Sequence, residues 1–166
     1  THGDGGSSTQ QNPSHLYSTP ALYNGKLTVT TNYGCRDSVT QVLNVKPAPT
    51  VDFTSTSVCL NKITEFTDLS NLPAIAGNIT NRNFYFGDNT TLNITSTPAF
   101  SHTYPLSGSF TAPLTVDADN GCSDTATREI VVHPLPATDF DASVFCLADK
   151  TQFKDISTIS SGSIVA

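Results

Sequence analysis

Short runs of alternating hydrophobic and polar residues recur along most of the chain. Such alternation gives a β-strand one buried and one exposed face. Between Pro47 and His133 the pattern predicts seven strands, at residues 51–56, 63–69, 83–86, 91–95, 100–104, 110–118 and 125–133. No segment has a sustained helical period, so the sequence predicts an all-β fold. Seven short strands separated by turns such as Asn120-Gly121 are typical of an immunoglobulin-like β-sandwich.

The same pattern returns at an offset of 87 residues, as between Cys35 and Cys122. The other repeated pairs include His15/His102, Tyr17/Tyr104, Pro47/Pro134, Phe53/Phe140, Cys59/Cys146 and Phe66/Phe153. A fixed offset of this kind indicates a tandem array of one structural unit. We therefore predict a first segment, 1–47, that carries the later strands of a unit, and a complete middle segment, 48–134. A last segment, 135–166, should supply only the first two strands of another unit.

The amino-acid composition indicates where the protein is found and which partners it does not bind. The 166 residues are 37% hydrophobic and only 13% charged, where a quarter is typical. A polar but uncharged surface rich in Thr, Ser and Asn is common in secreted β-proteins. The net charge of -6 and the lack of a Lys/Arg cluster argue against a nucleic-acid partner. No apolar run is long enough to span a bilayer, and the absence of Met favours a processed product or an internal fragment.

Two sequence motifs carry a family resemblance. Phe86–Asn89 reads F-G-D-N, and Pro98–Tyr104 reads P-A-F-S-H-T-Y. The first segment repeats them as G-D-G at Gly3–Gly5 and P-S-H-L-Y at Pro13–Tyr17. Together they resemble the PKD (polycystic-kidney-disease) domain. Further features, N-G-C-S-D at 120–124 and V-C-L at 58–60, resemble the subclass found in very long surface adhesins of gliding bacteria.

The resemblance implies an immunoglobulin-like fold and an extracellular role in contacts with proteins or carbohydrates, with no catalysis. The residues that it marks as structural are His15, Tyr17, Phe86, Gly87, Asp88, His102 and Tyr104. Tyr104 also precedes the penultimate predicted strand, where a tyrosine corner occurs in immunoglobulin folds.

His15 and His102 are the residues most easily mistaken for catalytic groups. A catalytic histidine needs a nucleophile and an orienting acid beside it. Because this histidine is duplicated with the unit, we favour a structural role in which the imidazole joins backbone groups beneath the F-G-D turn.

Asp4 and Asp88 lie in glycine-rich turns and are candidate calcium ligands. Calcium takes six to eight oxygen ligands, and the sequence has no D-x-D-x-D run. We favour the simpler interpretation that each aspartate caps its own turn. No other cofactor is expected.

The four cysteines, Cys35, Cys59, Cys122 and Cys146, are disulfide candidates because a Thr-rich acidic chain suggests an oxidising environment. Cys59 and Cys122 fall in loops at opposite ends of the predicted sandwich, roughly 25 Å apart. A disulfide needs Cα atoms within about 7 Å. We therefore predict bridges between consecutive units, each with a cysteine outside this chain. Free buried thiols are the alternative.

The sequence leaves three classes of function to compare. The first is a semi-rigid stalk or adhesive module of a cell-surface filament, with neighbouring repeats as partners. A variant of it has the last segment of one chain completing the first segment of a second copy by strand addition. The second class is an accessory module of a secreted hydrolase that binds a polymer or carbohydrate. The absence of Trp disfavours this, although Tyr33 lies beside a turn. The third class, an enzyme, ranks last because no catalytic motif is present.

Overall fold

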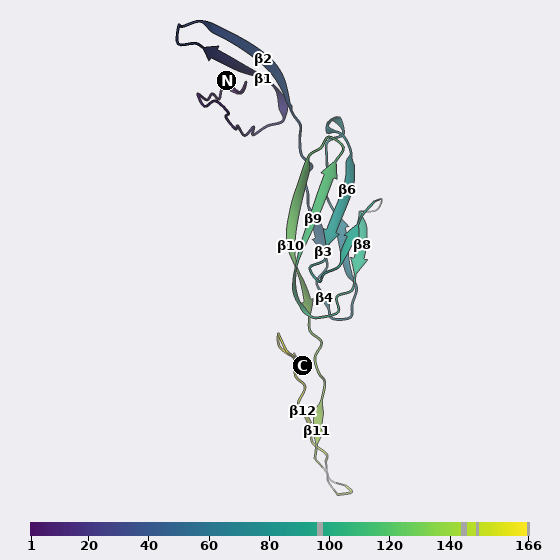
Figure 1. Cartoon of the computed structure of the whole chain (residues 1–166). Helices are drawn as coiled ribbons and strands as arrows, with labels where there is room; N and C mark the ends of the chain where they lie inside the picture. Colours follow the sequence, from purple (N-terminus) through teal and green to yellow (C-terminus); the bar gives the residue numbers. More distant parts are fainter. Residues whose placement is uncertain (96–97, 144–145, 149, 166) are drawn as a thin grey trace.

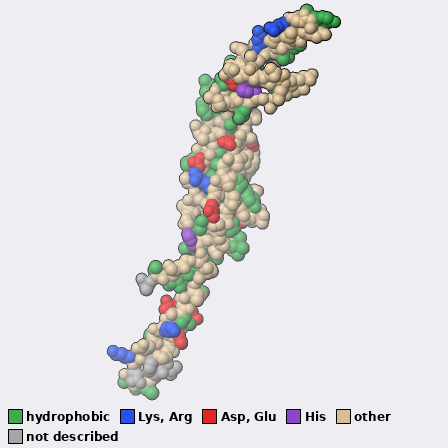
Figure 2. Space-filling model, turned by 90° about the vertical axis from the view of Figure 1, so that its left-hand side faces the viewer, with side chains coloured by type: hydrophobic (Ala, Val, Ile, Leu, Met, Phe, Trp, Pro, Cys, Tyr) green, Lys and Arg blue, Asp and Glu red, His purple; other side chains and the backbone are tan. Residues whose placement is uncertain are grey.

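The chain forms an elongated molecule in three parts. The computed structural model describes residues 1–95, 98–143, 146–148 and 150–165. The middle segment lies between the first and the last segment, so that these two extend from its opposite ends (Figure 1). On the face that Figure 2 shows, charged side chains are scattered along the body and hydrophobic side chains are exposed at both ends.

The middle segment is a two-sheet β-sandwich, as the alternation predicts. The larger sheet has, in spatial order, β4 (Val58–Cys59), β10 (Ser123–His133), β9 (Gly108–Ala118), β6 (Ile79–Tyr85) and β7 (Thr91–Asn93). The smaller sheet has β3 (Phe53–Ser55), β5 (Thr64–Asp68) and β8 (Ala99–His102). A short 3-10 helix, η1 (Ala74–Ala76), precedes β6. The immunoglobulin-like, all-β prediction is confirmed.

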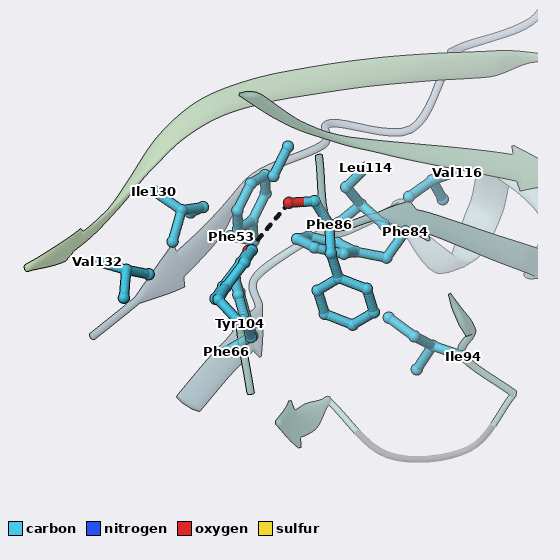
Figure 3. Packing of buried hydrophobic residues seen from close by; sticks show 11 residues of the cluster. Phe53, Phe66, Phe84, Phe86, Ile94, Tyr104, Leu114, Val116, Ile130 and Val132 are labelled. Atoms are coloured by element: carbon cyan, nitrogen blue, oxygen red, sulfur yellow. Dashed lines mark hydrogen bonds between the residues drawn. The ribbon is translucent and has the colours of Figure 1, made fainter. Parts of the chain in front are cut away.

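Strand alternation places one face of each sheet in a common core. In β9, Ala112, Leu114 and Val116 are buried, whereas in β5 the buried residues are Thr64, Phe66 and Asp68. The core cluster, most of which Figure 3 labels, comprises Phe53, Phe66, Phe84, Phe86, Ile94, Tyr104, Ala112, Leu114, Val116, Ile130 and Val132. Burying one large apolar side chain stabilises a fold by about 1.5–3 kcal/mol, so this cluster is the main source of stability.

Two details differ from the sequence-based prediction. β4 was not predicted, because a two-residue strand shows no alternation; it pairs in parallel with the end of β10, with Cys59 opposite His133. The strand predicted at 83–86 begins earlier, at Ile79, and a register shift between Ile79 and Asn81 interrupts its pairing with β9.

In the residues that the structure describes, each end segment holds a two-stranded sheet that no second sheet covers. In the first segment, β1 (Ala21–Thr30) and β2 (Arg36–Val45) form an antiparallel hairpin. In the last segment, β11 (Phe140–Ala142) pairs with β12 (Phe153–Asp155). Their apolar side chains remain exposed: Leu27 is 60% accessible where its equivalent Leu114 is 0%, and Phe153 is 72% accessible where Phe66 is 1%. No helix in the described residues is long and apolar enough to cross a membrane.

Candidate functional site

The most specific local structure is the tight turn that follows β6. The Phe86 amide donates to the Thr90 carbonyl over 3.0 Å, which closes the turn. Gly87 has φ +87°, and a Cβ atom there would lie 2.7 Å from the Thr111 carbonyl oxygen. A side chain at this position would meet both backbone strain and a backbone clash, so glycine is required.

Asp88 uses both carboxylate oxygens inside this turn. Its Oδ1 accepts hydrogen bonds from the amide and the hydroxyl of Thr90, and its Oδ2 lies 2.6 Å from Nε2 of His102. Burial opposes ionisation of the carboxyl, but the hydrogen bonds from Thr90 and His102 outweigh it and hold the pKa of Asp88 below its ordinary value. The carboxylate therefore caps its own turn and also anchors the histidine.

His102 and Tyr104 complete the cluster from the end of β8. The His102 ring stacks on Phe86 at a centroid distance of 4.1 Å and meets Tyr104 edge-on at 4.7 Å. The buried Tyr104 hydroxyl donates to the Phe86 carbonyl over 3.0 Å, the bond drawn in Figure 3. Burial, with the Asp88 charge as a smaller cause, raises the pKa of the phenol. We call Phe86, Gly87, Asp88, His102 and Tyr104 the turn cluster.

The first segment builds the same cluster from His2, Gly3, Asp4, His15 and Tyr17. Asp4 and His15 are joined at 2.6 Å, the distance of the Asp88–His102 pair. The Tyr17 hydroxyl donates to the His2 carbonyl over 2.8 Å, and the His2 and His15 rings stack at 4.1 Å. The bond from His15 is the main cause that lowers the pKa of Asp4, followed by the bond from the Gly6 amide.

Two expected partners were wrong. The imidazole of His102 contacts a carboxylate from the turn rather than backbone groups. The Tyr104 hydroxyl donates to the Phe86 carbonyl, 18 residues upstream, and so connects the end of β8 to the turn after β6. In a tyrosine corner the hydroxyl bonds a backbone group only a few residues upstream, so Tyr104 does not form one.

The cluster has the chemistry of a structural clamp. The Thr90 hydroxyl is 3.5 Å from His102 Nε2, but it donates to Asp88, and the same imidazole nitrogen is bonded to Asp88. The arrangement therefore lacks the order of nucleophile, base and acid that activates a hydroxyl.

The calcium candidates Asp4 and Asp88 each face a histidine in this arrangement. Among the described residues no group of three or more His, Cys, Asp or Glu side chains could hold a metal ion. Each carboxylate caps its own turn, as the favoured interpretation predicted: Asp88 accepts from the Thr90 amide and Asp4 from the Gly6 amide. Calcium binding stays an untested alternative.

All four cysteines carry free thiols, so the chain contains no disulfide; Cys35, Cys59 and Cys146 are exposed and Cys122 is half-buried. Cys59 pairs with the last residue of β10, whereas Cys122 directly precedes its first residue. The length of this 11-residue strand separates them by about 35 Å, which rules out a bridge within the unit. Bridges to cysteines outside the chain stay a prediction.

The contacts between the first and middle segments were not foreseen. Asn120, in the turn between β9 and β10, donates from Nδ2 to the Pro47 carbonyl over 2.9 Å and to the Ala76 carbonyl over 3.0 Å. Lys46 Nζ in turn donates to the Asn120 carbonyl over 2.9 Å. The Asn120-Gly121 pair indicated a turn, but nothing in the sequence indicated that this turn would contact the linker at Lys46 and Pro47.

Comparison with known proteins gives two kinds of match. The family model described as PKD domain matches residues 1–47 and again residues 44–132. The chain is similar to the PKD1 domain of Vibrio anguillarum Epp, with 25% identity and a TM-score of 0.46, over 52% of this chain and 95% of that one. It is also similar to the PKD1 domain from the Vibrio cholerae metalloprotease PrtV, with 29% identity and a TM-score of 0.45, over 52% and 98% of the two chains. No curated protein matches.

Proposed function

Since this chain belongs to the PKD domain family, we propose that it is a structural repeat module of an extracellular bacterial protein. In this role it acts as a semi-rigid stalk that carries or forms an adhesive surface, as in the large surface adhesins of gliding bacteria. The units are 1–47, 48–134 and 135–166, and the module has no catalytic activity of its own.

The observation that carries this proposal is the joint between the first and middle segments. The linker Lys46–Pro49 contains two prolines, which restrict the backbone. The turn between β9 and β10 holds this linker through the bonds of Asn120 and Lys46, and the Cys122 thiol lies 3.8 Å from the Lys46 carbonyl. A linker bonded to the next unit limits bending far more than a free one.

The shape of the middle segment fits the same role. The chain enters beside the turn that contains Asn120 and leaves at the other end of β10, beside Cys59. The middle segment therefore adds its full length to the array (Figure 1). The turn cluster supports this role in the first and middle segments, because its side-chain hydrogen bonds hold the turn and the residues after it together.

Small-angle X-ray scattering tests the stalk directly. We expect the full chain to scatter as an extended particle with restricted bending. Asn120→Ala should give a broader distribution of shapes, because the Pro47 carbonyl of the linker loses its hydrogen bond and only the bond from Lys46 to the backbone of residue 120 remains. Asn44→Ala, on the exposed face of β2, is the matched control and should scatter like the natural chain. Equal flexibility in all three would contradict a fixed joint.

A polymer-binding accessory role is the second candidate, since Tyr33 is 88% exposed in the turn between β1 and β2. A single aromatic ring is a small platform, and the equivalent position in the middle segment is Asn120. Pull-down of the chain by insoluble chitin or collagen, lost on Tyr33→Ala, would favour this role over a stalk.

A further inference from the structure

The turn between β9 and β10 places a reactive dipeptide at the joint between the first and middle segments. Asn120 is followed by Gly121, and asparagine is a chemically labile side chain. A glycine after asparagine favours attack of its backbone nitrogen on the side-chain amide, because no Cβ atom hinders the approach. Since the same amide holds the linker at Pro47, a reaction there acts directly on the joint.

We propose that Asn120 is a site of spontaneous deamidation, that the closed joint suppresses the reaction, and that the product leaves the joint open. The Gly121 nitrogen gives up its proton and bonds to Cγ of Asn120, the bond from Cγ to Nδ2 breaks, and Nδ2 leaves as ammonia. Water then opens the resulting succinimide ring at either carbonyl and yields aspartate or isoaspartate. The inference depends on the contacts of Asn120 and not on the extracellular role, so its failure would leave the proposed function standing.

In the closed joint the amide of Asn120 is held by three hydrogen bonds. Its Nδ2 donates to the Pro47 carbonyl over 2.9 Å and to the Ala76 carbonyl over 3.0 Å, and its Oδ1 accepts from the Cys122 amide over 2.9 Å. Attack turns the planar Cγ into a tetrahedral centre, and bonds that fix the plane of the amide oppose this change. The linker must therefore leave the turn before the reaction becomes fast.

The attacking group is also held while the turn is closed. The Gly121 amide donates to the Ala118 carbonyl over 3.0 Å, which shields the proton that must be removed. Apart from its chain neighbours, no heavy atom lies within 4 Å of a Cβ atom placed on Gly121, and the residue is exposed. Once the turn opens, water and hydroxide therefore reach the dipeptide without further rearrangement.

The product cannot make the contacts that close the joint. A carboxylate has no proton to donate, so the carbonyls of Pro47 and Ala76 lose their donors and face a negative charge. Isoaspartate also adds a methylene group to the backbone of the turn. Lys46, which donates to the carbonyl of Asn120, can pair with the new charge but cannot restore the bond to Pro47. Deamidation thus converts a held linker into a free one irreversibly.

The chain contains a second Asn-Gly pair that serves as an internal reference. Asn24 and Gly25 lie in β1, opposite Val42 and Gln41 of β2. Their strand partners belong to the first segment and not to the joint. A change that opens the joint should therefore raise the reaction rate at Asn120 and leave the rate at Asn24 unaltered.

Peptide mapping by mass spectrometry during incubation at neutral pH, in reducing buffer, tests the proposal. Asn120 should react at least about tenfold more slowly in the folded full chain than in urea, because the folded chain reacts only through its open fraction. Lys46→Ala removes a bond of the joint and should raise the rate at Asn120 about threefold. Lys62→Ala, beyond β4 at the other end of the middle segment, is the matched control and should change neither rate.

The product itself is tested with Asn120→Asp. In small-angle scattering this variant should show the broader distribution of shapes expected of an open joint. Equal rates at Asn120 in the folded and the urea-unfolded chain would overturn the proposal, as would an Asn120 rate that Lys46→Ala leaves unchanged. An Asn120→Asp chain that scatters like the natural chain would show that deamidation does not open the joint.

Discussion

The first and middle segments hold the same turn cluster in different surroundings. In both, a histidine is bonded to the aspartate of a glycine turn at 2.6 Å, and a tyrosine is bonded to the carbonyl before that glycine. Yet Leu114 is buried under a second sheet while its equivalent Leu27 is exposed. The cluster therefore depends on nearby residues and one strand, whereas the core depends on strands far apart in sequence.

The largest contrast is expected at the core phenylalanines. Phe66→Ala removes a fully buried ring from the middle segment and should lower its free energy of unfolding by about 3–5 kcal/mol. Phe153→Ala removes the equivalent exposed ring and should change it by less than about 0.5 kcal/mol. Denaturant unfolding of the dilute full chain measures the free energy of unfolding of both variants. Equal losses would contradict the difference between a buried and an exposed ring.

The glycine of the turn gives the next largest effect. Gly87→Ala should cost about 1–3 kcal/mol, because the new Cβ meets the Thr111 backbone at a positive φ. Gly3→Ala produces the same conflict with the Asn24 backbone, at 2.7 Å. Because Gly3 lies outside the middle segment, Gly3→Ala should leave the thermal transition of the middle segment unchanged. A lowered transition in Gly3→Ala would show that the two segments unfold together.

The tyrosine hydroxyl should matter more where it is buried. Tyr104→Phe leaves the Phe86 carbonyl without its hydrogen bond and should destabilise the middle segment by about 1–2 kcal/mol. Tyr17 is only partly buried, so water can replace its hydroxyl at the His2 carbonyl. Amide exchange at residues 3–6 and at 87–90 compares the two variants. A greater increase in exchange rate around Gly3 than around Gly87 would contradict this order.

The smallest effect is the acid dependence of the turn. The pKa of Asp88 is lowered on folding, so the unfolded chain binds more protons and stability falls as pH drops below about 4. Asp88→Asn should cost about 1 kcal/mol or less at pH 7, because the amide keeps one acceptor oxygen for Thr90 and loses only the carboxylate oxygen bonded to His102. The difference from the natural chain should shrink as the pH falls through the lowered pKa. A constant difference from pH 7 to pH 2.5 would show that the charge of Asp88 contributes nothing.

The parts of the fold that the sequence predicted are those set by local alternation. β5 and β9 follow directly from side chains that alternate between the core and the exterior. β4 was missed because its pairing with β10 is parallel and spans only two residues. The resemblance to PKD domains identified the members of the turn cluster in the middle segment. It did not show that His102 would bond Asp88, since the side-chain partner is fixed only once β8 is placed beside the turn. The Asn120 contact with Pro47 joins loops 73 residues apart, and no local pattern encodes it.

The central claim is that, among the described residues, the middle segment alone contains a closed core, while each end segment holds a two-stranded sheet that no second sheet covers. Amide hydrogen exchange along the dilute full chain tests it most directly. We predict slow exchange in β5, β6, β9 and β10 and exchange at least about a hundredfold faster in β1, β2, β11 and β12. Protection in β1 and β2 equal to that in β9 and β10 would contradict the claim.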